Sequence, residues 1–257
     1  MSKLGVVTCQ VLELEFAHVL LNDPKVAEIW VVHDEFSEEL IHILENTNLK
    51  QVHRITKIDE FNPDKTNGLI VLVRVMKLGL HSNIAILRSG VAKAVKEISS
   101  FVDAVFLGYG LCGNAFKDRK ELFKGIGVPV SLPMENEDPV DDCVGLIIGG
   151  RDNYYSEQCF CAGTMFINSG FSRHWENFLS LDIPEKLIHK KEKILHCLMG
   201  NYERALLLPT NILGEDELRK NTEGFNEKFD LKIASRPGTL ALFENAWEIA
   251  KRNAEGL

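Results

Sequence analysis

The chain has 257 residues, a formal net charge of −8 at pH 7 and a pI near 5.5. Its 45% hydrophobic and 26% charged residues are ordinary for a globular protein with a buried core. The acidic balance and the lack of Lys/Arg runs argue against nucleic-acid binding, and no apolar stretch reaches the ~20 residues of a membrane span. Because the N-terminal stretch has no signal-peptide pattern, we expect a cytoplasmic protein whose six cysteines are not a disulfide framework.

Short apolar runs alternate with helical patterns through the first 150 residues. Strands are expected in chain order at 4–8, 26–33, 69–73, 103–107 and 128–132, with a short element near 52–55. Helices are expected at 13–21, 37–44, 84–98 and from 141 or 142 to 148. Continuous apolar strands that alternate with helices are typical of a parallel sheet covered on both faces. We therefore predict a doubly wound α/β fold with a mostly parallel sheet.

The last third of the chain has a different pattern. A strand is expected at 164–168 and an edge strand at 231–234, and helices are expected at 183–199, 215–218 and 240–252. No repeat or linker marks a boundary. The prediction is a single domain over 1–257, with its sheet core at about 4–170 and a helical C-terminal part at about 171–257.

Cysteine and histidine residues follow several of the expected strands. Cys9 ends the first strand, His81 follows the third, Cys112 lies in a glycine turn after the fourth, and Cys143 opens the helix after the fifth. The spacing from His81 to Cys112 equals that from Cys112 to Cys143, 31 residues, which is about one βαβ step. Since ligands bind beyond the carboxyl ends of parallel strands, these side chains are predicted to share one sheet edge.

Thiolate and imidazole are zinc ligands, and three cysteines can hold an iron–sulfur cluster with one iron left open. A helix N-terminus also favours the thiolate form of a cysteine. Cys9, His81, Cys112 and Cys143 are therefore the candidate metal ligands, and the residues do not choose between zinc and a [4Fe-4S] cluster. The competing interpretation is that each thiol is a small buried hydrophobe.

The glycine turn itself is a second candidate site. Gly108, Gly110 and Gly113 satisfy GxGxxG after a strand, which is typical of a dinucleotide-binding turn, and with Tyr109 they are the candidate cofactor-binding residues. The segment after the turn is charged and short, and the acidic residue expected about 20 positions on is only a loop glutamate, Glu135. Nucleotide binding therefore remains an alternative.

The remaining cysteines carry weaker signals. Cys197 lies in a helical pattern and is predicted to be core. Cys159 and Cys161 could be an accessory or redox-sensitive pair, or structural residues at the start of a strand. Asp141 and Asp142 could be an acid pair, although a helix N-cap explains at least one of them.

The segment Leu107–Asn114, LGYGLCGN, resembles the signature of a family of uncharacterised bacterial and archaeal proteins, a domain of unknown function. The resemblance covers roughly residues 4 to 175 and takes in further positions: Cys9, Leu80-His81, Asp142-Cys143, Leu146 to Gly149, Tyr154, Gly163-Thr164 and Ser169-Gly170. The chain departs from the family pattern at Asp141, Ala162 and Phe171, where a histidine, a proline and a tryptophan are common.

Members of that family are often encoded near corrinoid-dependent methyltransferases of anaerobes. The resemblance therefore implies a role in corrinoid or one-carbon methyl metabolism, with a corrinoid protein or methyltransferase as partner. With the candidate ligands, it suggests a metal or iron–sulfur protein in which an open metal position activates a thiol for methyl transfer. The alternatives are a non-catalytic accessory protein that binds a nucleotide or small molecule, and an assembly factor for a methyltransferase.

Overall fold

A six-stranded, all-parallel sheet forms the centre of the protein. The computed structural model describes residues 2–63, 67–179, 183 and 185–257. The strand order is β3-β2-β4-β1-β5-β6, so β1 lies between β4 and β5. The strands are β1 (Ser2–Cys9), β2 (Val26–Val32), β3 (Gln51–Ile55), β4 (Leu69–Met76), β5 (Ala104–Gly108) and β6 (Val130–Ser131).

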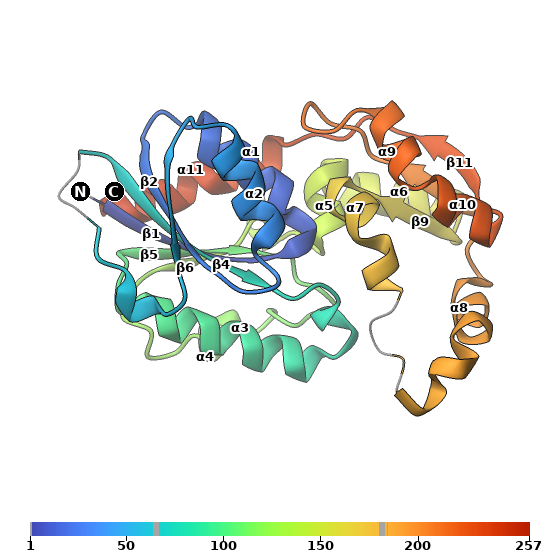
Figure 1. Ribbon diagram of the computed structural model, residues 1–257, viewed down its shortest axis with the longest axis horizontal. Coiled ribbons are helices and arrows are strands. Elements are labelled where there is room, and N and C mark those ends of the chain that lie inside the picture. The colour runs from blue at the N-terminus through green and yellow to red at the C-terminus, as the bar shows by residue number, and fades with distance from the viewer. Residues whose placement is uncertain (1, 64–66, 180–182, 184) are drawn as a thin grey trace.

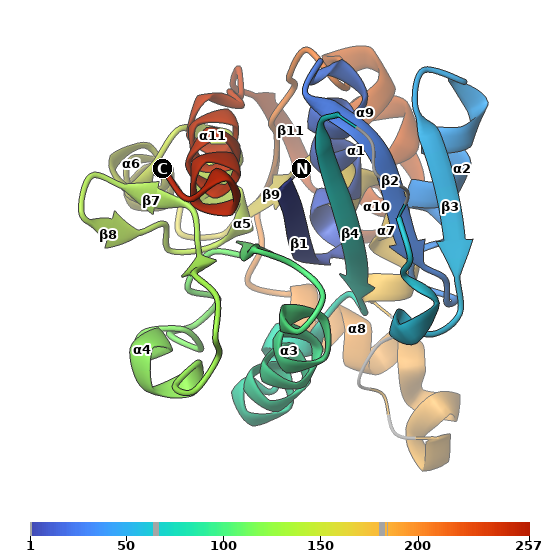
Figure 2. The same cartoon turned by 90° about the vertical axis from the view of Figure 1, so that its left-hand side faces the viewer.

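Helices cover both faces of this sheet (Figure 1, Figure 2). One face carries α1 (Glu13–Asn22), α2 (Glu38–Asn46) and α11 (Ala241–Glu255), and the other carries α3 (Ile84–Ser99) and the short α4 (Arg119–Leu122). Single-turn 3-10 helices lie at Gln10–Leu12, Ile58–Glu60 and Leu80–Ser82. The predicted doubly wound α/β fold is confirmed.

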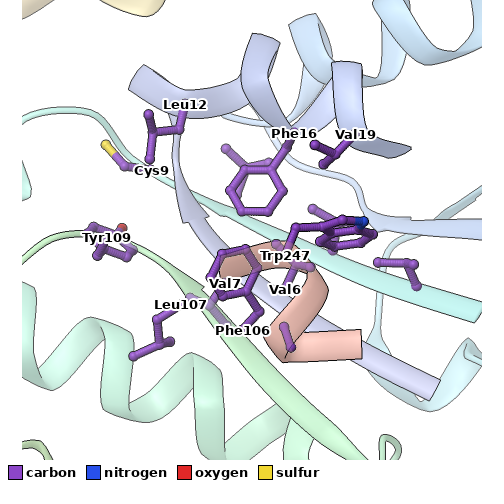
Figure 3. Packing of buried hydrophobic residues seen from close by; sticks show 14 of the residues in the cluster. Val6, Val7, Cys9, Leu12, Phe16, Val19, Phe106, Leu107, Tyr109 and Trp247 are labelled. Carbon is purple, nitrogen blue, oxygen red and sulfur yellow. The ribbon is translucent and has the colours of Figure 1, made fainter. Parts of the chain in front are cut away.

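Aromatic side chains join α1, β5 and α11 in the core. The ring centroid of Phe16 lies 5.6 Å from that of Phe106 and 4.9 Å from that of Phe243. Figure 3 shows Phe16 and Phe106 packed with Val6 and Trp247. This packing fixes the carboxyl ends of β1 and β5 side by side, because both strands lie under the same helices.

A second, three-stranded parallel sheet lies in the C-terminal third, in the order β11-β10-β9. Its strands are β9 (Thr164–Ile167), β10 (Arg204–Leu207) and β11 (Lys232–Ser235). β9 and β11 match expected strands, whereas no strand was predicted at the position of β10. The helices here are α7 (Ser169–Phe178), the 3-10 segment Glu185–Lys190, α8 (Lys191–Met199), α9 (Glu215–Asn221) and α10 (Glu223–Phe229). Position 184 of the expected helix 183–199 lies outside the described residues.

A hairpin and two helices link the sheets: β7 (Met134–Glu135), β8 (Asp138–Pro139), α5 (Cys143–Ile148) and α6 (Arg151–Phe160). The N-terminus of α7 then packs directly on the turn after β1. A Cβ on Gly170 would lie 2.1 Å from the carbonyl oxygen of Val11, so this approach requires glycine. Among the described helices, none has the length and apolarity to cross a membrane.

Candidate functional site: a cysteine-lined cavity

A cavity of about 620 Å³ opens where the carboxyl ends of β1, β4 and β5 meet α5, α7 and β9. All four residues predicted as metal ligands line it: Cys9, His81, Cys112 and Cys143. They come from four separate turns of the chain. The sequence predicted that these residues share one edge of the sheet. The structure places all four on one cavity at the carboxyl edge, where parallel sheets bind ligands.

Cys9 is the last residue of β1 and immediately precedes the 3-10 helix Gln10–Leu12. Its side chain is buried. Burial raises the pKa of the Cys9 thiol to about 11, although a hydrogen bond from the Val11 backbone lowers it and the charge of Glu13 raises it further. The thiol is therefore protonated at neutral pH unless a cation lies beside it.

Cys112 is held against the start of α5 by backbone pairing. The Leu111 N–H donates to the Val140 carbonyl at 2.7 Å, and the Cys112 N–H donates to the Asp141 carbonyl at 2.9 Å. The approach is close enough that a Cβ on Gly110 would lie 2.5 Å from Cα of Asp142. Cys112 itself has a φ of +46°, in the left-handed region that non-glycine residues rarely occupy.

Cys143 is the first residue of α5. Asp142 is the N-cap of this helix, and its Oδ1 accepts a hydrogen bond from the Gly145 N–H at 2.8 Å. The sequence suggested that a helix N-terminus would favour the thiolate, but the pKa of Cys143 is raised well above its usual value. Burial is the largest cause, followed by the charges of Asp142, Cys112 and Cys9. Burial and negative neighbours outweigh the helix end.

The three thiols are close enough to perturb one another. The pKa of Cys112 is raised by burial first and then by Cys9 and Asp142. The pKa of Tyr109 is raised by burial and then by the charges of Cys9, Cys112 and Cys143. Figure 3 shows Cys9 at the end of β1 and Tyr109 beyond the end of β5, on the same side of the packed core. The site thus gathers one buried thiol, two half-buried thiols and one buried phenol on the same cavity.

His81 occupies a different part of the cavity. It lies in the 3-10 helix Leu80–Ser82, is exposed, and its ring stacks on Phe178 of α7 at 6.0 Å between centroids. It therefore lies at the rim, while Cys9 is buried. Across the described ranges, no group of three His, Cys, Asp or Glu side chains is arranged so that it could hold one metal ion.

The glycine turn contributes to the cavity in part. Gly108, Tyr109 and Gly113 line it, whereas Gly110 is pressed against Asp142. The turn is followed by further turns and then by the four-residue α4, so it lacks the following helix whose N-terminus binds a pyrophosphate. A dinucleotide-type site at this turn is therefore not supported by its geometry.

Further polar residues line the cavity, and of these Asn168 was not singled out in the sequence. Asn168 caps α7 through its Oδ1, which accepts from the Phe171 N–H at 2.9 Å, and its Nδ2 is buried without a hydrogen-bond partner. The Tyr154 hydroxyl hydrogen-bonds Asp142 and accepts from Gln158 at 3.0 Å. An asparagine just before a helix is a detectable N-cap signal, but only the fold shows that it faces a cavity.

The remaining cysteines lie apart from the cavity lining. Cys159 and Cys197 are exposed and Cys161 is half-buried. The prediction that Cys197 is a core residue is wrong, because α8 presents it and the neighbouring Leu198 to the outside. Asp141 is not one of a free acid pair, since both of its carboxylate oxygens accept hydrogen bonds from Arg151 at 3.0 Å.

Fold and site together define an α/β protein with a cysteine-lined cavity between two parallel sheets. Comparison with protein families gives one match, the family described as "Protein of unknown function (DUF1638)", over residues 75–247. Because this match spans well over half of the chain, the protein belongs to that family. The matched range contains Cys112 and Cys143 but begins after Cys9. No curated protein and no solved structure gives a significant match.

Proposed function

We propose that this protein binds a metal centre through the thiolates of Cys9, Cys112 and Cys143, with one metal position open to the cavity. The observation that carries the proposal is that three thiols from separate turns line one cavity and each is influenced by another thiol or by a nearby carboxylate. These three thiols are costly to ionise, because the cavity desolvates them and their thiolate forms would repel one another. A bound cation reverses that cost, because it deprotonates the thiols that coordinate it.

An iron–sulfur cluster suits this arrangement better than a single zinc ion. Zinc requires its sulfur ligands to meet at about 2.3 Å from one point, and the described side chains form no such group. In a cluster each thiolate binds a different iron, so the ligands stay farther apart. The exposed position of His81 supports three protein ligands rather than four. His81 then lies where it could exchange a proton with a bound molecule.

When bound, a centre with an open position supplies a Lewis acid that lowers the pKa of a coordinated thiol. The chain's own contribution is to hold the three ligands, to surround the position with apolar walls and to keep bulk water from it. The proposed setting is the cytoplasm of an anaerobe, in corrinoid or one-carbon methyl metabolism. This setting rests on the family resemblance. The sequence has no Asp-x-His-x-x-Gly segment, so a corrinoid would belong to a partner protein.

Metal analysis of protein purified without oxygen tests the proposal. We expect about four irons and matching sulfide per chain, with a visible absorption band that is lost in Cys112→Ser. Cys197→Ser is the matched control, because this exposed thiol lies outside the cavity lining. About one zinc per chain, lost in the same variant, would favour the zinc alternative. Less than about a tenth of an equivalent of either metal after reconstitution would refute a metal centre.

The second candidate is a small-molecule-binding accessory protein without catalysis, and the size of the cavity favours it. It predicts that ligands stabilise the protein equally well after Cys112→Ala. An assembly factor for a methyltransferase would instead co-purify with that enzyme and show no requirement for the three thiols.

A further inference from the structure

The walls of the cavity carry no fixed cationic charge. Among the described residues that line it, none is Lys or Arg, and the histidine lies at the rim. An anion moved from water into such a space loses its hydration and finds no counter-charge. The carboxylate of Asp142 adds to that penalty. Nucleotides, phosphates and carboxylates are therefore poor ligands for the body of this cavity.

Among the described residues that line the cavity, Asp142 is the one carboxylate, and groups of the protein already occupy it. Its Oδ1 accepts a hydrogen bond from the Gly145 N–H at 2.8 Å, at the N-terminus of α5. The carboxylate therefore faces the positive end of that helix. A cationic ligand would find no other carboxylate among these described lining residues, and the desolvation cost of an unpaired charge applies to cations as well.

Two buried donors on the walls lack partners within the described structure. These are the hydroxyl of Tyr109, a residue 3% exposed, and Nδ2 of Asn168, a residue 1% exposed. Buried donors are normally paired, and an unpaired one costs free energy. Both groups would be satisfied by an oxygen acceptor. The rest of the wall is largely apolar, with Leu78, Phe166 and Phe171 among the lining residues.

We infer that the cavity takes an uncharged small organic molecule that carries an oxygen acceptor, with Tyr109 and Asn168 as its hydrogen-bond donors. The inference deepens the proposed function, because it names the substrate class of the same site. If the ligand is a thiol compound that binds the open metal position through its sulfur, the rest of that molecule is uncharged. The inference concerns the side chains of the cavity walls, so it applies directly to the metal-free protein.

Three probes of similar size and different charge test the inference: isobutyramide, isobutyrate and the isobutylammonium ion, which has no oxygen acceptor. Binding is measured by ligand-observed NMR and by the shift in melting temperature. We expect isobutyramide to bind at least about tenfold more tightly than either ion. Equal binding of all three, preference for an ion, or no binding would overturn the inference.

Substitutions in the cavity wall test whether the probe binds in the cavity and whether Tyr109 donates to it. Ala162→Trp narrows the cavity at a lining residue and should abolish amide binding, while Leu49→Trp, at an exposed residue outside the lining, should not. Tyr109→Phe should weaken amide binding several-fold without lowering the melting temperature, and Tyr155→Phe should leave it unchanged. Unchanged binding in Tyr109→Phe would refute the role of that hydroxyl.

The same titration in Cys112→Ser distinguishes the two possible failures. Amide binding retained in this variant supports the ligand class whatever the metal analysis shows. Metal bound by the wild type without any amide binding would leave the metal centre in place and overturn the ligand class.

Discussion

Glu15 makes the stability of the protein depend on pH in a direction opposite to that of most carboxylates. The residue lies in the first turn of α1 and is fully buried. One of its oxygens accepts a hydrogen bond from the Ser169 hydroxyl, and the other has no partner in the described structure. Burial raises the pKa of Glu15 to about 7, with Ser169 lowering it and the charge of Glu13 raising it.

The folded protein therefore binds this proton more tightly than the unfolded chain does. Unfolding free energy must fall as pH rises from the ordinary value of 4.5 to about 7, and the penalty is complete above that value. A shift of this size corresponds to about 3 kcal/mol. Glu15→Gln cannot ionise, so its stability relative to the wild type should increase by about 3 kcal/mol between pH 4 and pH 8.

Urea unfolding of both proteins at several pH values between 4 and 8, under a reductant, measures the difference. Other titrating groups, among them Glu13 and His174, are present in both proteins and largely cancel. Ser169→Ala provides a matched comparison, because loss of its hydrogen bond should move the transition to higher pH. A stability difference between Glu15→Gln and the wild type that is the same at pH 4 and pH 8 would refute the reasoning.

Two further substitutions test how the site and the core are held. Gly110→Ala places a Cβ against the rigid backbone of Asp142. It should destabilise the protein by about 1–3 kcal/mol and reduce metal binding. Gly127→Ala, which has open space around it, should have neither effect. Asp23→Ala removes the buried one of the two carboxylates that pair with the Lys251 ammonium, leaving only the exposed Glu248, and it also removes the acceptor of the Trp247 N–H. Urea unfolding should show a loss of about 3 kcal/mol. Burial alone raises the pKa of Asp23, but its hydrogen bonds with Lys251 and neighbouring donors lower it overall. The stabilisation should therefore be present at neutral pH and disappear on acidification, and a flat acid profile would contradict this assignment.

Much of the fold follows from local patterns in the chain. The apolar runs at 4–8, 69–73 and 103–107 are strands of the central sheet because only a position covered on both faces accommodates such runs. The strand Arg204–Leu207 could not be recognised in the same way. It is four residues long, begins with a charged residue and is defined by pairing with β9 and β11, which are distant in sequence.

The sequence was enough to locate the candidate site in the fold but not to predict the depth or ionisation of its side chains. The rule that ligands bind at the carboxyl ends of parallel strands placed Cys9, Cys112 and Cys143 on one edge. It gave no information about side-chain depth, and His81 follows β4 yet stacks on Phe178 at the rim. The pKa of the Cys143 thiol was expected in the wrong direction, because helix position is visible in a sequence and burial is not.

At position 112 the backbone conformation favours glycine, whereas the proposed metal site requires a cysteine. A left-handed conformation costs a non-glycine residue of the order of 1–2 kcal/mol, and the neighbouring Gly113 adopts it as well. Selection for stability alone would favour glycine at both positions. The proposed role of Cys112 as a metal ligand accounts for a cysteine at the first of them. Among its relatives, a chain with glycine at this position would be expected to keep the fold and to have lost the function of the cavity.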